Sequence, residues 1–189
     1  MPATRPARLY ILSKKEREKT MIGGEQSTLE PKVSIEEVMQ EEKRLLFDRF
    51  SRKDAVELGK IMLDKMEELN MTFSFVIKLN GLVVFQYLPE GTGQFNLLWM
   101  EKKIHTVELL GRSTMGLWVG LDSRGVKRDN SQLLPSSDIV LCGGGFPIKL
   151  KDGEVVGAVA TSGPGDQNDH YFGVECLDEL LRRKESRAE

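Results

Sequence analysis

Two tight-turn signals, each flanked by apolar runs, constrain most strongly what this chain can fold into. The turns are Asn80-Gly81 and Asp152-Gly153, and the flanking runs are residues 73–79, 82–88, 143–148 and 155–163. A two-residue turn that matches the twist of paired strands needs positive φ angles, which Asn, Asp and Gly tolerate. The sequence therefore predicts two β-hairpins, with the clearer signal at Asn80-Gly81.

Helix signals precede, separate and follow these hairpins. Ser34 with Glu37, and Ser51 with Asp54, have the spacing of capping boxes, which predicts helices over about 35–47 and up to residue 70. A cap at Asn96 and the terminator Gly111 predict a middle helix, and apolar spacing predicts a last helix over 169–183. Residues 113–121 fit either a helix or a strand, and the polar residues 122–137 are predicted to form an exposed loop.

This order of elements lacks the strict strand–helix alternation that builds a parallel doubly wound sheet. It predicts an α+β fold with one antiparallel sheet and helices on at least one face. The sheet contains both hairpins and has room for one further strand at its edge. A chain of 189 residues suits one core. We expect a single domain over 31–189 after a flexible extension at 1–30, with Met21 as an alternative translation start.

Composition argues against several classes of protein. The net charge of -2 and the absence of a basic helical stripe argue against nucleic-acid binding. No segment approaches the roughly 20 apolar residues of a membrane span, and the apolar run at 9–12 is too short for a signal peptide. Cys142 and Cys176 lack zinc-site spacing. We expect a cytoplasmic protein with two reduced core thiols and no metal site.

Several motifs together resemble one known family. They are Gly144-Gly145-Phe146-Pro147-Ile148, Gly157-Ala158-Val159 with Ser162-Gly163, Asp169-His170, and upstream Glu42-Lys43-Arg44, Phe50, Asn96, Trp99, Lys102, Lys103 and Ser113. Across about 41–181 the chain resembles the haem-degrading-domain family, which includes GlcG-like and HbpS-like proteins and the C-terminal domain of PduO-type cobalamin adenosyltransferases. It looks closest to the family's uncharacterised branch, in which an Arg-Phe pair stands where this chain has Leu109-Leu110.

The resemblance implies a profilin-like antiparallel sheet flanked by helices, and assembly into dimers or larger rings. Some relatives bind haem or corrinoid, so the resemblance implies these as candidate ligands. It therefore favours a homo-oligomeric protein that binds a small anionic planar molecule, with another copy of itself as its partner.

One candidate wall of a binding cleft lies on the middle helix and just after it. Trp99, Lys103 and Arg112 combine a stacking ring with cations that hold carboxylates or phosphates. Trp99 and Lys103 are four residues apart and share a helix face. The alternative is a core tryptophan beside solvated charges.

The opposite wall would come from the glycine-edged hairpin. Gly144 and Gly145 permit close approach of a ligand or a second subunit, or else form a β-bulge. Ser162 and Gly163 precede a helix start whose amides can hold an anion, unless Asp166 and Asp169 already cap that end.

His170 and His105 are the only histidines, and His170 is the better candidate ligand for haem iron because it adjoins the glycine turn. Its alternative roles are capping and subunit contact, and His105 is expected to be solvated. Ser162 with His170 lacks a nucleophile elbow, which disfavours hydrolysis and leaves any catalytic residue unknown. Besides ligand binding, the open alternatives are a scaffold acting through protein partners and an enzyme acting on a small metabolite.

Overall fold

The computed structural model describes residues 33–126 and 137–187. Within them the helices are α2 (Ile35–Arg44), α3 (Arg52–Leu69), α4 (Gln94–Leu110), α5 (Thr114–Asp122) and α6 (Asp166–Ser186). The strands are β1 (Leu46–Phe47), β2 (Ser74–Leu79), β3 (Leu82–Tyr87), β4 (Gly145–Leu150) and β5 (Val155–Ser162). The extension predicted at 1–30 and most of the exposed loop predicted at 122–137 lie outside the described residues.

The described strands form one sheet in the order β1-β4-β5-β2-β3. Both predicted hairpins are confirmed as antiparallel pairs, β2 with β3 and β4 with β5, and β5 also pairs antiparallel with β2. The edge strand β1 runs parallel to β4, so the sheet is mixed and not wholly antiparallel.

That edge strand corrects the predicted end of the first helix. Helix α2 ends at Arg44, and Leu46 and Phe47 pair with Lys149 and Leu150. Phe47 is 1% exposed and belongs to the main core, so burial against the sheet outweighs continuation of the helix.

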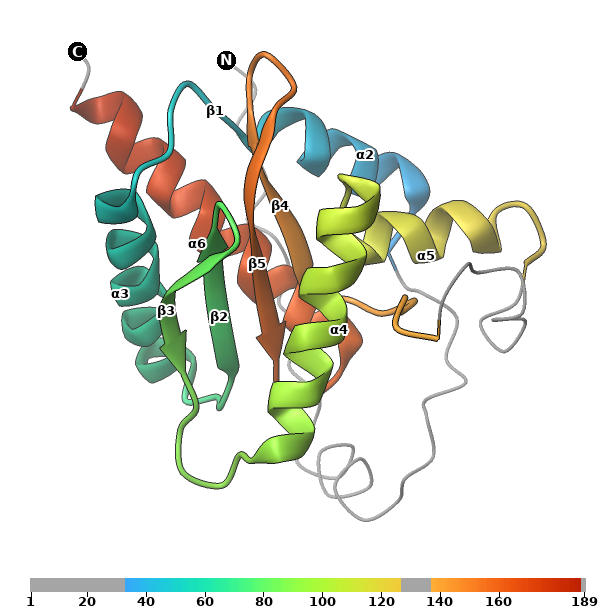
Figure 1. The fold of residues 1–189 in the computed structure, drawn as a ribbon, viewed down its shortest axis with the longest axis horizontal. Helices are drawn as coiled ribbons and strands as arrows, with labels where there is room; N and C mark the ends of the chain where they lie inside the picture. The colour runs from blue at the N-terminus through green and yellow to red at the C-terminus, as the bar shows by residue number, and fades with distance from the viewer. Residues whose placement is uncertain (1–32, 127–136, 188–189) are drawn as a thin grey trace.

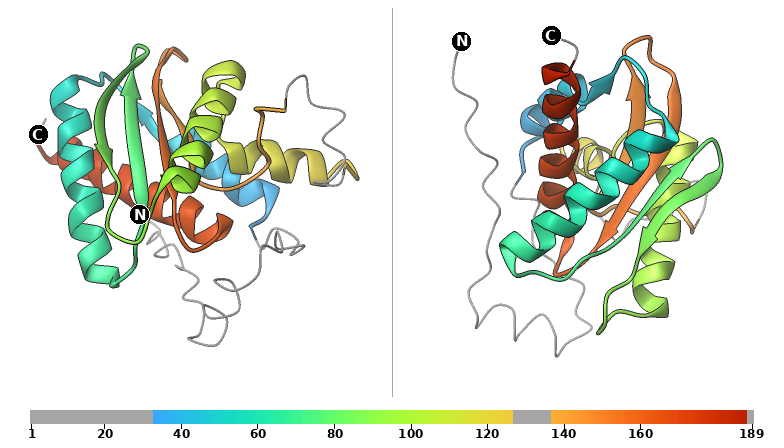
Figure 2. Two further views of the ribbon diagram at one scale, coloured as in Figure 1. Left: turned by 60° about the horizontal axis from the view of Figure 1, so that its bottom comes forward. Right: turned by 90° about the vertical axis from the view of Figure 1, so that its left-hand side faces the viewer.

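Helices cover both faces of the sheet, which confirms the α+β fold class (Figures 1 and 2). Strand β5 shows how the core divides, because successive side chains of a strand point to opposite faces. Val159 packs into the cluster with α3 and α6, whereas Ala158 and Ala160 pack against α4. Helices α2 and α5 pack together beyond β4, in a third cluster that includes Val38 and Trp118.

Local capping signals set most helix starts. Ser34 Oγ accepts a hydrogen bond from Glu37 N at 3.1 Å, and Ser51 and Asp54 form the reciprocal capping box. Residues 113–121 resolve as a helix, with Ser113 as its cap. Helix α4 begins before Asn96, whose side chain accepts from Gly93 N at 3.1 Å.

Candidate functional site

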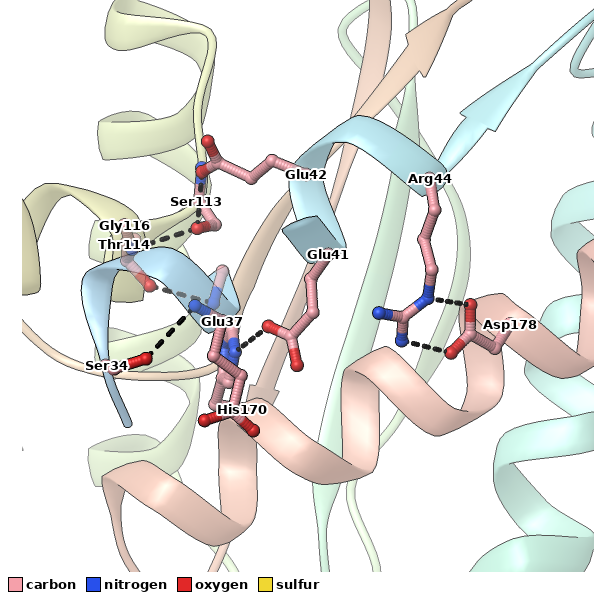
Figure 3. Close-up of polar contacts among 11 residues, drawn as sticks. Ser34, Glu37, Glu41, Glu42, Arg44, Ser113, Thr114, Gly116, His170 and Asp178 are labelled. Carbon is pink, nitrogen blue, oxygen red and sulfur yellow. Dashed lines mark hydrogen bonds and ion pairs between the residues drawn. The ribbon is translucent and has the colours of Figure 1, made fainter. Parts of the chain in front are cut away.

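A small pocket lies where α2, the α4–α5 turn, β4 and α6 meet. Its volume is about 40 Å³. The apolar lining residues are Val38, Leu45, Phe146, Pro147 and Val174, and the others are Glu41, Glu42, Gly111, Arg112, Ser113, Lys149 and His170. Figure 3 shows how α2 directs Glu41 toward α6 and Glu42 toward the start of α5.

The deepest polar feature of this pocket is a buried carboxylate–imidazole pair. His170 is 1% exposed, and its Nε2 lies 2.8 Å from Glu41 Oε2 (Figure 3). The ring stacks on Phe146 with centroids 5.3 Å apart. Its Nδ1 is buried and has no hydrogen-bond partner among the described residues. When Nε2 carries the proton and donates it to Glu41, Nδ1 presents a lone pair, and metal-bound histidines are oriented by a carboxylate in the same way.

The opposite end of the pocket is organised around the start of α5. Glu42 Oε1 accepts hydrogen bonds from Ser113 N at 2.9 Å and from Ser113 Oγ at 2.7 Å. Arg112 Nη2 lies 3.9 Å from Glu42 Oε2. A Cβ on Gly116 would lie 2.5 Å from Glu42 Oε1 and 3.1 Å from Arg112 Nη2, so glycine leaves the space for both side chains.

Arg112 itself is only partly satisfied. Its Nε is buried and lacks a hydrogen-bond partner in residues 33–126 and 137–187, although the side chain as a whole is 39% exposed. A buried donor without an acceptor costs about 1–3 kcal/mol. The pocket thus contains an unused donor at one end and an unused ring nitrogen at the other.

Lys103 lies outside this pocket, which corrects the predicted wall with Trp99. Its Nζ donates to Thr161 O at 2.6 Å and to Asp169 Oδ2 at 2.7 Å, and the residue is 2% exposed. Burial opposes the charge on Lys103, but the Asp169 carboxylate holds the pKa of Lys103 above its ordinary value. Trp99 is half-buried and packs edge-on against Phe95 instead.

The glycines of the second hairpin contact their own chain. A Cβ on Gly144 would lie 2.5 Å from Thr161 Oγ1, and a Cβ on Gly145 would lie 2.6 Å from Thr114 Cγ2. Both glycines are buried, so the close approach that they permit is to β5 and α5. The register irregularity of this hairpin falls later, between Ile148 and Lys149, and not at the glycines.

Ser162 and Gly163, from the predicted anion site at the last helix, also contact their own chain. Ser162 is buried and accepts a hydrogen bond from Asn96 Nδ2 at 3.3 Å, and a Cβ on Gly163 would clash with Phe73. Helix α6 starts earlier than predicted, with Gly165 as the N-cap and no side-chain cap bond. Asp169 lies in the first turn of α6 and pairs with Lys103.

Of the predicted site residues, Arg112 and His170 line the pocket, whereas the others do not. His105 is exposed on α4. Glu41 and Lys149 were not predicted as site residues, and Glu42 was named only as part of the family motif. A signal for Glu41 was available, because Val38, Glu41 and Leu45 lie on one helical stripe and an acid among buried apolar residues needs a partner.

Metal-binding clusters and membrane-spanning helices are both absent from the described residues. In 33–126 and 137–187, no group of three or more His, Cys, Asp or Glu side chains is placed to hold a metal ion. No helix in these ranges combines the length and the apolar character that crossing a membrane requires.

The sequence and the fold of this chain are similar to those of known proteins. A family model described as "Haem degrading protein HbpS-like" matches residues 50–178. A UPF0303 protein of Azotobacter vinelandii is 31% identical over 150 residues, which are 79% of this chain and 90% of the relative. The crystal structure of the Ybr137w protein has a TM-score of 0.68 at 22% identity, covering 91% of this chain and 99% of that one. The PduOC:heme complex has a TM-score of 0.56 at 17% identity, covering 68% and 93%.

Proposed function

Because this chain belongs to the HbpS-like family of haem-degrading proteins, we propose that it binds a small ligand in the pocket between α2, β4 and α6, where His170 contacts that ligand. The observation that carries the proposal is the buried Nδ1 of His170, which lacks a partner among the described residues while Glu41 holds Nε2. An oriented imidazole with a free nitrogen suits coordination of an iron or acceptance of a proton from a ligand.

A tetrapyrrole is the first ligand to test, because a structural neighbour is a heme complex. The pocket of about 40 Å³ has room for roughly three water-sized groups, so a macrocycle enters only if α2 moves. Polar side-chain contacts hold α2 in place, among them Glu41 with His170, Glu42 with Ser113, and Arg44 with Asp178.

The test is a haemin titration of the full chain, followed by the Soret band. His170→Gln keeps a side chain that can hydrogen-bond Glu41 but cannot ligate iron through an imidazole. His105→Gln is the matched control, at an exposed position of α4. Saturable binding whose spectral shift is lost only in His170→Gln supports the proposal. Equal spectra for all three proteins, or non-saturating uptake, would contradict it, provided that circular dichroism shows each variant folded.

We also propose that the protein self-associates. Self-association is equally expected of the alternative function, a scaffold that acts through protein partners. Leu82 and Val83 of the edge strand β3, and Phe95 and Leu98 of α4, are exposed apolar side chains. Exposed edges of this kind favour contact with another chain. Sedimentation of Val83→Glu tests it, because a lower mass than the parent protein supports this interface and an unchanged assembly contradicts it.

A bulky substitution at Gly144, such as Gly144→Arg, is unsuitable for testing subunit contact. Gly144 has a φ of +95° and is enclosed by Thr161 and Asp169 of the same chain. An arginine there would disrupt the fold, so a lost assembly would not report on a subunit contact.

The buried thiols of Cys142 and Cys176 agree with a reducing, cytoplasmic compartment.

A further inference from the structure

The chemistry of the pocket narrows the class of ligand, on the premise that the proposed function is correct. We infer that the pocket takes a carboxylate, which Arg112 and Lys149 hold. The carboxylate belongs either to a small organic acid or to an acidic arm of a larger ligand.

The first support is the unused capacity of Arg112. A guanidinium binds a carboxylate best through two parallel N–H donors at about 2.7–2.9 Å. Glu42 does not provide this, since its nearer contact to Arg112 Nη2 is 3.9 Å and its Oε1 already accepts two hydrogen bonds from Ser113. The buried Nε–H of Arg112 therefore still lacks an acceptor among the described residues.

The second support is Lys149, which lines the same pocket from β4. The neighbouring lysine on this hairpin, Lys151, is satisfied by Asp48 at 2.9 Å. No ion pair of Lys149 occurs in the part of the chain that the structure describes. Lys149 thus adds a second cation to the pocket lining, and it has no ion-pair partner among the described residues.

The balance of charge favours a monoanion. The pocket lining also contains two carboxylates: Glu41 pairs with His170, and Glu42 accepts hydrogen bonds from Ser113 and lies 3.9 Å from Arg112. Among the described residues, the cationic donors left for a ligand are thus Arg112 Nε and the Lys149 ammonium. The fixed carboxylates still repel additional charge, so a phosphate dianion is disfavoured.

The size of the pocket agrees with this class of ligand. A volume of about 40 Å³ has room for roughly three water-sized groups, and a carboxylate contributes three heavy atoms. The apolar side chains of Leu45, Phe146 and Val174 provide a surface for the carbon chain that follows. The carboxylate occupies the pocket. The rest of the ligand either lies in solvent or displaces α2.

Acetate is a direct probe for this inference. The Arg112 Nε–Hε signal and the Gly111 amide are followed by ¹H–¹⁵N NMR during titration with sodium acetate, and with sodium chloride at equal ionic strength. We expect a saturable acetate-specific shift at both positions. In Arg112→Gln and Lys149→Ala the Gly111 shift should weaken, whereas Arg124→Gln and Lys151→Ala should behave as the parent protein. Identical shifts with chloride and acetate would overturn the inference.

Haemin dimethyl ester separates this inference from the proposed function, because it keeps the iron and loses both carboxylates. We expect haemin to bind roughly tenfold tighter than the ester, the effect of losing one charge-assisted hydrogen bond, and Arg112→Gln to remove this difference. Equal affinities that still depend on His170 would overturn the carboxylate site and leave the proposed function standing. Saturable acetate binding without haemin binding would support the site, identify a small acid as the source, and contradict coordination by His170.

Discussion

The ammonium of Lys103 lies 2.7 Å from Asp169 Oδ2, and both residues are buried, so an ion pair joins α4 to α6 inside the fold. Lys103 also donates to the main-chain oxygen of Thr161 at the end of β5. Three elements thus meet at one lysine. Since Asp169 immediately precedes His170, this contact also helps to fix where the pocket imidazole lies.

Replacing Lys103 with Met should destabilise the protein by about 3–5 kcal/mol, because it leaves the Asp169 carboxylate buried without its cation. The free energy of unfolding is measured by urea denaturation at pH 7.5. Lys102→Met is the control, because Lys102 makes surface contacts at 3.2 Å and 3.7 Å, and it should cost below about 1 kcal/mol. Recovery of stability in a Lys103→Met, Asp169→Leu double variant would confirm the pairing, whereas equal losses in both lysine variants would contradict it.

Asp169 should also make stability depend on pH. Burial raises the pKa of Asp169 to about 6, although Lys103 lowers it. The folded state then binds this proton more tightly than the unfolded state. The resulting stabilisation is complete below about pH 4, the ordinary range of an aspartate, and is lost as the pH rises through about 6.

Urea denaturation between pH 4 and pH 7.5 tests this dependence. The parent protein should lose stability relative to Asp169→Asn over that range by on the order of 2 kcal/mol. Taking the difference between the two proteins removes the titration of the other carboxylates. Parallel stability curves would show that Asp169 titrates at the same pH in both states.

The parts of the fold that could be predicted from sequence have local causes. The Asn80-Gly81 turn has positive φ at both residues, and Gly111 ends α4 with a φ of 65°. These conformations depend on the residues themselves. The same holds for Ser51 and Asp54, whose capping box joins neighbours in sequence.

The features that could not be predicted depend on distant segments. Helical periodicity includes Phe47 in the first helix, but pairing with Leu150, about a hundred residues later, makes it a strand. Spacing places Lys103 and Trp99 on adjacent positions of one helix, yet only the packing of β5 and α6 shows that Lys103 is buried. The pocket combines four separate segments, so its shape is a tertiary property.

Removing Glu41 should disturb His170 without unfolding the protein. Glu41→Ala leaves the buried Nε2–H of His170 without its acceptor, at a cost of about 1–3 kcal/mol. Two-bond ¹H–¹⁵N spectra of the imidazole should show a change in the proportion of the two neutral tautomers. Glu36→Ala, at an exposed position of the same helix, should leave the spectrum unchanged. An unaltered tautomer in Glu41→Ala would show that this carboxylate does not orient the ring.

The start of α6 should be sensitive to a single methyl group at Gly143. A Cβ there would clash with the main-chain oxygen of Asp166 and lie 3.0 Å from His170 Cβ. Because a backbone carbonyl cannot rotate away as a side chain does, α6 must shift, and we expect Gly143→Ala to cost about 3 kcal/mol or more.

Gly93→Ala is the matched control for that substitution, because a Cβ at Gly93 meets nothing within 4 Å. It should cost below about 1 kcal/mol, the usual effect of a weaker helix cap. Thermal unfolding measures both variants, and NMR measures the His170 resonance. If Gly143→Ala remains folded, His170 should move away from Glu41 and the signature of the pair should weaken. Equal stability of the two variants, with an unchanged His170 resonance, would show that the Gly143 contact does not position α6.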